Sequence, residues 1–105
     1  MQNDELTAEE IIALGYDVPR QLPDGRWIAV HRMLYTTGLF VGLDRCGYKT
    51  RFCYENFGDA VHAALTWDGN GDPPGLWIKE KGAGGDRINP EWARANNVSP
   101  DSDLE

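Results

Sequence analysis

The chain has 105 residues, 41% of them hydrophobic and 26% charged, and its formal net charge at pH 7 is −7. This length fits one ordinary domain, and the four Trp, four Tyr and three Phe residues exclude the composition of a disordered chain. We therefore expect a single domain over residues 1–105, with a core at about 7–82 and a flexible acidic tail at about 96–105.

The charge is unevenly distributed. Residues 26–55 have five Lys or Arg residues against two Asp or Glu residues, whereas the stretches before and after them are acidic. An acidic total opposes non-specific attraction to nucleic acid or to anionic membranes, but the basic segment allows a local exception.

The sequence predicts a protein that stays in the cytoplasm. It lacks a run of the roughly 18 to 20 apolar residues that a membrane helix needs, and its first five residues are acidic where a signal peptide would be basic. Cys46 and Cys53 are too few for a disulfide framework and lack the paired spacing of a zinc site. We expect both cysteines to be reduced thiols.

The first predicted element is a short helix. Thr7 is a candidate N-cap, Glu10 completes a capping box, and an apolar stripe from Ile11 to Leu14 ends at Gly15. The prolines and the Asp-Gly pair between residues 19 and 25 then predict a linker and a turn.

Three stretches alternate with the period of two residues that is typical of strands: 27–34, 39–43 and 48–55. The Asp44–Gly47 segment between the last two is a strong hairpin signal. In the first stretch the alternation places Ile28, Val30 and Leu34 on one side and Trp27, His31 and Met33 on the other.

A helix that covers the sheet is predicted next. Asn56 is its N-cap, Gly69 and Gly71 follow its end, and the prolines beyond predict a non-repetitive connection. The predicted fold is α+β: a three-stranded antiparallel meander with one covering helix, a short N-terminal helix and an irregular C-terminal extension. The apolar stripe of the covering helix consists of Phe57, Ala60, Val61, Ala64 and Leu65.

The patterns do not predict a metal site, a cofactor or an enzyme. Asp68, Asn70 and Asp72 match the start of a calcium loop, but Pro73 and Lys79 stand where that loop needs Gly and Glu, so a helix cap and turn is the favoured interpretation. The soft ligands His31, His62, Cys46 and Cys53 are not expected to converge. Arg51 lies two residues before Cys53, which is not sufficient for a cysteine nucleophile.

The exposed side of the predicted sheet is the better candidate for a binding surface. Trp27 and His31 from the first strand are expected near Lys49 and Arg51 from the third. Aromatic and Arg residues on a rigid sheet are typical of interface hot spots and of base-stacking platforms. The alternative is that the N-terminal helix or the segment around Trp77 covers this side.

Four stretches of the sequence are distinctive: Leu22–Trp27, TTGLFVGLD at 36–44, FCYE at 52–55 and WDGNGDPPGLWIKEKG at 67–82. Together they resemble a group of small uncharacterised proteins encoded by proteobacterial phages and prophages. The resemblance covers about residues 6 to 90, and its most distinctive stretch is the last. It implies a genomic setting and carries no assigned activity or functional residues.

The resemblance implies a non-catalytic accessory protein that binds a host protein complex and inhibits it, as anti-CRISPR and other anti-defence proteins do. Its acidic ends would face a basic surface meant for nucleic acid, and the chain would be a monomer or a homodimer. The alternative is a small nucleic-acid-binding module that uses the basic central sheet. The predicted partner-binding residues are Trp27, His31, Lys49, Arg51, Asp68, Asp72 and Trp77.

Overall fold

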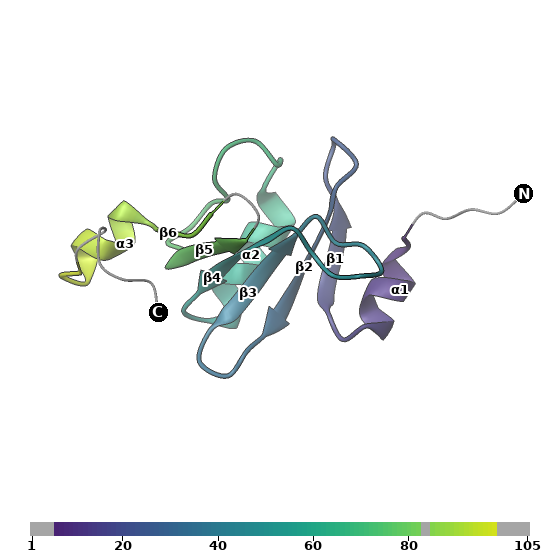
Figure 1. Ribbon diagram of the computed structural model, residues 1–105, viewed down its shortest axis with the longest axis horizontal. Helices are drawn as coiled ribbons and strands as arrows, with labels where there is room; N and C mark the ends of the chain where they lie inside the picture. The colour runs from purple at the N-terminus through teal and green to yellow at the C-terminus, as the bar shows by residue number, and fades with distance from the viewer. Residues whose placement is uncertain (1–5, 83–84, 99–105) are drawn as a thin grey trace, which may run out of the picture.

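The computed structural model describes residues 6–82 and 85–98, which form three helices and one sheet (Figure 1). The sheet is antiparallel and has six strands, and each strand pairs with the next one along the chain. No helix among the described residues is long and apolar enough to cross a membrane. The elements are α1 (Ala8–Ala13), β1 (Asp17–Gln21), β2 (Trp27–Arg32), β3 (Thr37–Val41), β4 (Thr50–Tyr54), α2 (Phe57–Thr66), β5 (Lys79–Gly82), β6 (Arg87–Ile88) and α3 (Pro90–Ala95).

The α+β class, the antiparallel meander, the short N-terminal helix and the covering helix are confirmed, but the prediction of three strands is wrong. β1 lies where the sequence predicts a linker. Pro19 argues against a strand because it lacks a backbone N–H, but β1 is an edge strand, and an edge strand tolerates a missing donor. β5 and β6 lie in the predicted irregular extension. The Lys-Glu-Lys-Gly sequence of β5 has no apolar alternation, since both faces of this strand carry charge.

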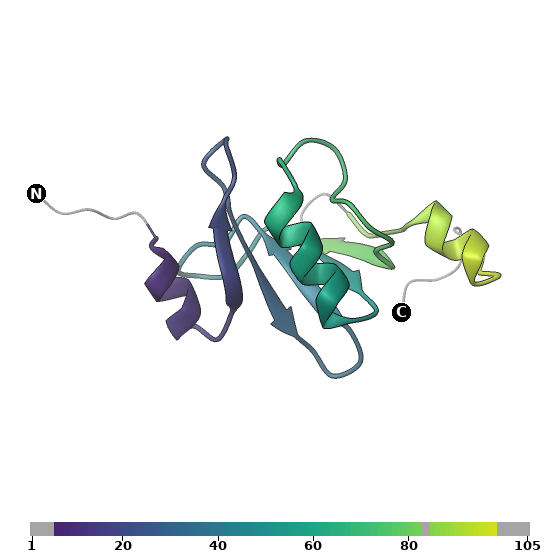
Figure 2. The same cartoon turned by 180° about the vertical axis from the view of Figure 1, so that it is seen from behind.

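The main core lies between α2 and one face of the sheet, and Figure 2 shows α2 across this face. α2 buries Ala60, Ala63 and Ala64 completely, and these small side chains let the helix approach the strands closely. The prediction for Leu65 is wrong: it is 57% exposed, because the buried stripe is centred on the alanines and not on the larger residue. The sheet contributes Ile28, Val30, Leu39, Val41, Phe52 and Tyr54, and Leu22, Trp67 and Trp77 complete the core.

Both predicted helix caps are present. Thr7 and Glu10 form a reciprocal capping box at the start of α1, with the Thr7 hydroxyl accepting from the Glu10 N–H at 3.2 Å. The Asn56 side chain accepts from the Asp59 N–H at 2.8 Å and begins α2. These local signals therefore fix where two helices start.

Two arginines stabilise the other end of α2 and the loop that follows it. Arg20 of β1 donates through Nη1 to the carbonyl oxygens of Ala64, at 3.1 Å, and Trp67, at 2.5 Å. Arg26 donates through Nη2 to the Gly69 carbonyl oxygen at 2.8 Å, in the loop that follows α2. The last carbonyls of a helix lack intrahelical partners and carry partial negative charge, so a cation satisfies both needs.

The predicted acidic tail lies partly outside the described residues. Asn96 to Val98 form a turn that closes α3: the Val98 N–H donates to the Ala93 carbonyl oxygen at 2.8 Å, and Asn97 has a positive φ of 57°. Residues 99–105, on which the rest of this prediction falls, lie outside the part that the structure describes.

Replacing Arg20 with Ala should destabilise the fold by about 1.5 to 3 kcal/mol, because the carbonyls at the end of α2 lose a charged donor. Urea unfolding followed by circular dichroism measures this free energy. Arg94→Ala, at an exposed position of α3, is the matched control and should change it by less than about 0.5 kcal/mol. Equal stabilities of the two variants would contradict the role assigned to Arg20.

Candidate partner-binding face

The face of the sheet opposite α2 is covered at one end. Ile11 of α1 and Leu43 of the loop after β3 pack on Ala29 and Phe40 of the sheet in a second core. The alternative that the N-terminal helix covers this side is therefore confirmed for the end near β1 and β2. It is wrong for Trp77, which belongs to the core beneath α2. We call the remaining surface over β3, β4 and β5 the open face.

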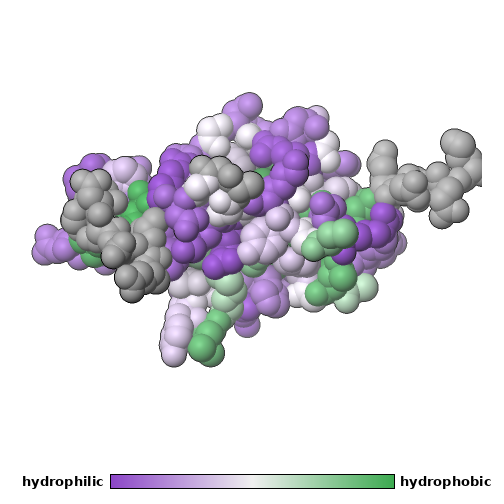
Figure 3. All heavy atoms as spheres, viewed as in Figure 1, coloured by the Kyte–Doolittle hydropathy of each residue, from purple (hydrophilic) through white to green (hydrophobic). Residues whose placement is uncertain are grey.

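Pairing between strands places four cations on the open face. Directly paired residues of antiparallel strands point to the same side. Lys49 precedes β4 by one residue and follows the same alternation as Arg51. Figure 3 shows hydrophilic side chains gathered where Figure 1 places β4 and β5. Two rows of directly paired residues from β3, β4 and β5 cross the open face: Phe40–Arg51–Lys81 and Gly38–Cys53–Lys79. We call Lys49, Arg51, Lys79 and Lys81 the basic strip.

Arg51 lies at the centre of the basic strip and is half-buried. Its Nη1 donates to the Tyr48 hydroxyl at 2.6 Å, while its buried Nε has no hydrogen-bond acceptor among the described residues. Partial burial opposes its charge, but interactions with the Cys53 thiol and the Tyr48 hydroxyl outweigh this and raise the pKa of Arg51. The guanidinium is therefore held in place while part of its donor capacity is unused.

Aromatic rings cross the same side of the sheet in edge-to-face contacts. The Phe40 ring centroid lies 5.3 Å from that of Tyr16, 6.2 Å from that of His31 and 4.7 Å from that of Tyr48. The Phe40 ring lies over Gly38, where an added Cβ would stand 2.6 Å from it. Phe40 is 5% exposed. It is thus a packing residue, and Tyr48, at 38%, is the ring beside the strip that solvent can reach.

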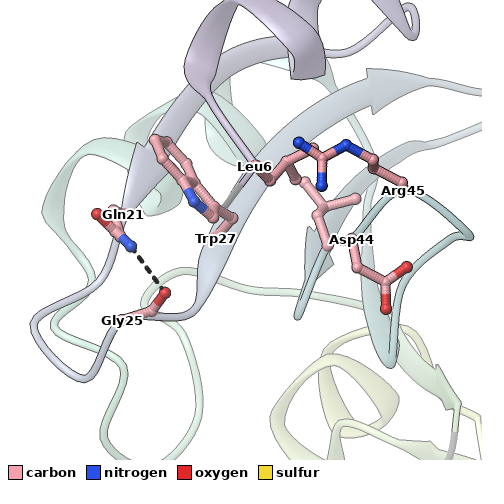
Figure 4. A pocket seen from close by; sticks show the side chains of 7 residues that line it. Leu6, Gln21, Gly25, Trp27, Asp44 and Arg45 are labelled. Atoms are coloured by element: carbon pink, nitrogen blue, oxygen red, sulfur yellow. Dashed lines mark hydrogen bonds between the residues drawn. The ribbon is translucent and has the colours of Figure 1, made fainter. Parts of the chain in front are cut away.

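The structure brings Lys49 and Arg51 together and places Trp27 and His31 nearer to α1. His31 is exposed, and its Nδ1 hydrogen-bonds the Gly15 carbonyl oxygen at 3.1 Å. Trp27 is half-buried and borders a cavity of about 330 Å³ between β2, the segment at Leu6 and the loop after β3 (Figure 4). These predicted residues share one side of the sheet but not one cluster.

The other three predicted residues lie on the α2 side of the sheet or in the loop after α2. Asp68 is exposed and accepts from the Asn70 N–H at 2.9 Å. Asp72 forms an ion pair with Arg87. Trp77 is 2% exposed and packs edge-to-face on Phe52 at 5.1 Å. They are not brought together with the residues of the open face.

Within residues 6–82 and 85–98, no group of three or more His, Cys, Asp or Glu side chains is arranged to hold a metal ion. The loop that resembles a calcium site is instead an Asx turn at Asp68 followed by the ion pair of Asp72. Cys46 is exposed and Cys53 is buried, both as free thiols.

The turn between β2 and β3 carries two large exposed side chains. Leu34 is 85% exposed and Tyr35 is 88% exposed, whereas the alternation predicts Leu34 on the buried side. That prediction is wrong because β2 ends at Arg32, and the Met33 N–H then donates to the Thr36 carbonyl oxygen at 2.8 Å to close the turn. Figure 3 shows an apolar projection where this hairpin lies in Figure 1. We call Leu34 and Tyr35 the hairpin tip.

The sequence analysis missed two features of the candidate face. Lys79 and Lys81 join the basic strip through the pairing of β4 with β5, which no local signal indicates. The hairpin tip had a usable signal, since Leu-Tyr replaces the Gly, Asn or Asp that tight turns favour.

Comparisons with protein-family models, with curated proteins and with solved structures found no match. The resemblance to phage and prophage proteins therefore stays a prediction.

Leu34 and Leu39 form a matched pair for testing the hairpin tip, because they are 85% and 0% exposed. Leu34→Ala should change the free energy of unfolding by less than about 0.5 kcal/mol, whereas Leu39→Ala should cost about 2 to 5 kcal/mol. Urea unfolding of both variants measures the difference. A large loss in the Leu34 variant would show that the tip serves folding and not binding.

Proposed function

We propose that this chain is a non-catalytic binding protein that attaches to a protein complex in the cytoplasm of a host cell and inhibits it. The observation that carries the proposal is the basic strip on the open face of an otherwise acidic chain. The partner would present acidic side chains there, since complementary charges orient an encounter and accelerate it. The resemblance to phage and prophage proteins supports a host complex as the class of target.

Most arginines outside the basic strip serve intramolecular roles, which makes the strip stand out. Arg20 holds the end of α2 and Arg26 the loop after it, Arg45 pairs with Glu10 at 2.9 Å, and Arg87 pairs with Asp72 and Glu80. By contrast, Lys49 and Lys79 form no salt bridge with any described residue. Cations that the fold does not use are available to a partner.

An acidic protein surface fits the open face better than nucleic acid does. A base-stacking platform needs aromatic rings whose flat faces are exposed. Phe40 is 5% exposed, and the Tyr48 ring is engaged in an edge-to-face contact with Phe40 while its hydroxyl accepts from Arg51. The net charge of −7 also repels a polyanion such as nucleic acid at long range. The hairpin tip adds the kind of apolar contact that protein interfaces use at their centre.

The open face also supports binding better than the acidic loop does. Arg87 already offsets the charge of Asp72, and Trp77 is buried. Asp68 remains as an exposed carboxylate whose pKa is lowered mainly by the hydrogen bond from the Asn70 N–H. It would contribute to a secondary contact with a basic surface of the target.

A charge reversal in the basic strip should abolish partner capture. Tagged protein is incubated with nuclease-treated host lysate at several salt concentrations, and bound proteins are identified by mass spectrometry. The unmodified chain should retain one complex in stoichiometric amount, Lys79→Glu should lose it, and Arg94→Glu, the same charge change on α3, should keep it. Retention by Lys79→Glu equal to that of the control would refute the assignment of the face.

Binding to nucleic acid is the second candidate, because the basic strip itself favours it. It predicts retention of a 15-nucleotide single strand that weakens steeply as salt rises. Fluorescence anisotropy at low salt measures this, and an unchanged signal would eliminate the candidate.

A further inference from the structure

We infer that the Asp86 side chain occupies part of the basic strip in the free protein, and that the partner displaces it with an acidic segment of extended polypeptide. This inference rests on the proposed function and goes beyond it by naming the chemistry of the contacting segment. It also implies that the chain limits its own affinity.

Asp86 lies on the basic strip through contacts within its own hairpin. Its Oδ2 is 3.1 Å from Lys81 Nζ, and its Oδ1 accepts from the Gly82 N–H at 3.4 Å. The Gly85 N–H donates to the Gly82 carbonyl oxygen at 3.0 Å, and the two Asp86 contacts direct its carboxylate to β5. The side chains of Lys81 and Asp86 remain 28% and 43% exposed, so a competing carboxylate can reach the pair.

The Asp86 carboxylate also interacts with the charge of Arg51 on the neighbouring strand β4. Lys81 pairs directly with Arg51, and the pKa of Asp86 is lowered first by its hydrogen bond with Lys81 and further by the charges of Lys81 and Arg51. Asp86 therefore offsets charge on two members of the basic strip. A partner must replace it to use both cations.

The spacing of the cations fits an extended acidic peptide. Lys79 and Lys81 lie on one face of β5, two residues apart, which is roughly 7 Å along a strand. Alternate side chains of an extended peptide recur at the same interval of roughly 7 Å. A segment with acidic residues at every second position would thus meet Lys79 and Lys81 in register, and its carboxylates are the same group that Asp86 supplies.

The test uses a fluorescein-labelled decapeptide in which Glu and Ser alternate, with anisotropy as the readout, and a 15-nucleotide oligo(dT) as the second probe. Asp86→Asn should bind the peptide about fivefold more tightly than the unmodified chain, since an exposed ion pair is a weak competitor. Asp24→Asn is the matched control: it removes one carboxylate from an exposed ion pair, 2.8 Å long, with Arg26. It should bind the peptide like the unmodified chain.

Each other outcome contradicts a defined part of the inference. Equal tightening by Asp86→Asn and Asp24→Asn would show an effect of net charge alone. No tightening by Asp86→Asn, with binding still lost in Lys79→Glu, would overturn the inference and leave the proposed function standing. Absence of peptide binding by every variant would overturn both, and tighter binding of the oligonucleotide than of the peptide would refute the peptide class. Circular dichroism of each variant confirms that it is folded.

Discussion

The pairing of β4 with β5 is the interaction on which the open face depends. After β4 the chain forms α2 on the opposite side of the sheet and must return to the free edge of β4 before Lys79 and Lys81 can join Arg51. Trp77 fixes this return because it is buried beneath α2, and the Ile78 N–H then donates to the Cys53 carbonyl oxygen at 2.6 Å. A core residue on one side of the sheet thus determines the charge pattern on the other.

The cations divide by type between structure and surface. Arginine holds several oxygens at once through its planar fork, as Arg20 does at the end of α2 and Arg87 does between Asp72 and Glu80. The basic strip is mostly lysine, whose mobile ammonium group adapts to a partner. Its field is local, since salt screens charges beyond about 8 Å under physiological conditions. The strip can therefore attract an acidic surface although the whole chain is negative.

The sequence allowed prediction of features whose cause is local. The capping box at Thr7, the Asn56 cap and the alternation through Ile28 and Val30 each depend on residues a few positions apart. β5 was not predictable because its place depends on a partner strand more than twenty residues away along the chain. For Leu34 the alternation continued past the true end of the strand, so a turn residue was assigned to the core.

The same limit applied to the candidate site. Lys49 and Arg51 share one strand pattern and lie together. Asp68 and Trp77 were predicted from the loop after the covering helix, and the structure places Asp68 in that loop and Trp77 in the core on the other side of the sheet. Period-two alternation tells which residues share a face of one strand. It does not tell which strands are neighbours, and the membership of a surface cluster depends on that information.

The basic strip and the hairpin tip impose different requirements on one partner. Charges orient an encounter, and well-packed apolar and aromatic contacts supply most of the affinity of an interface. A standard interface covers about 800 Å² on each partner, which is a patch about 28 Å across. Gly38 follows the hairpin tip by three residues and shares a row with Lys79, which lies two strands away at about 4.8 Å per strand. A single partner of ordinary size can therefore contact the strip on β4 and β5 and the turn between β2 and β3 together, provided that an apolar pocket adjoins its acidic segment.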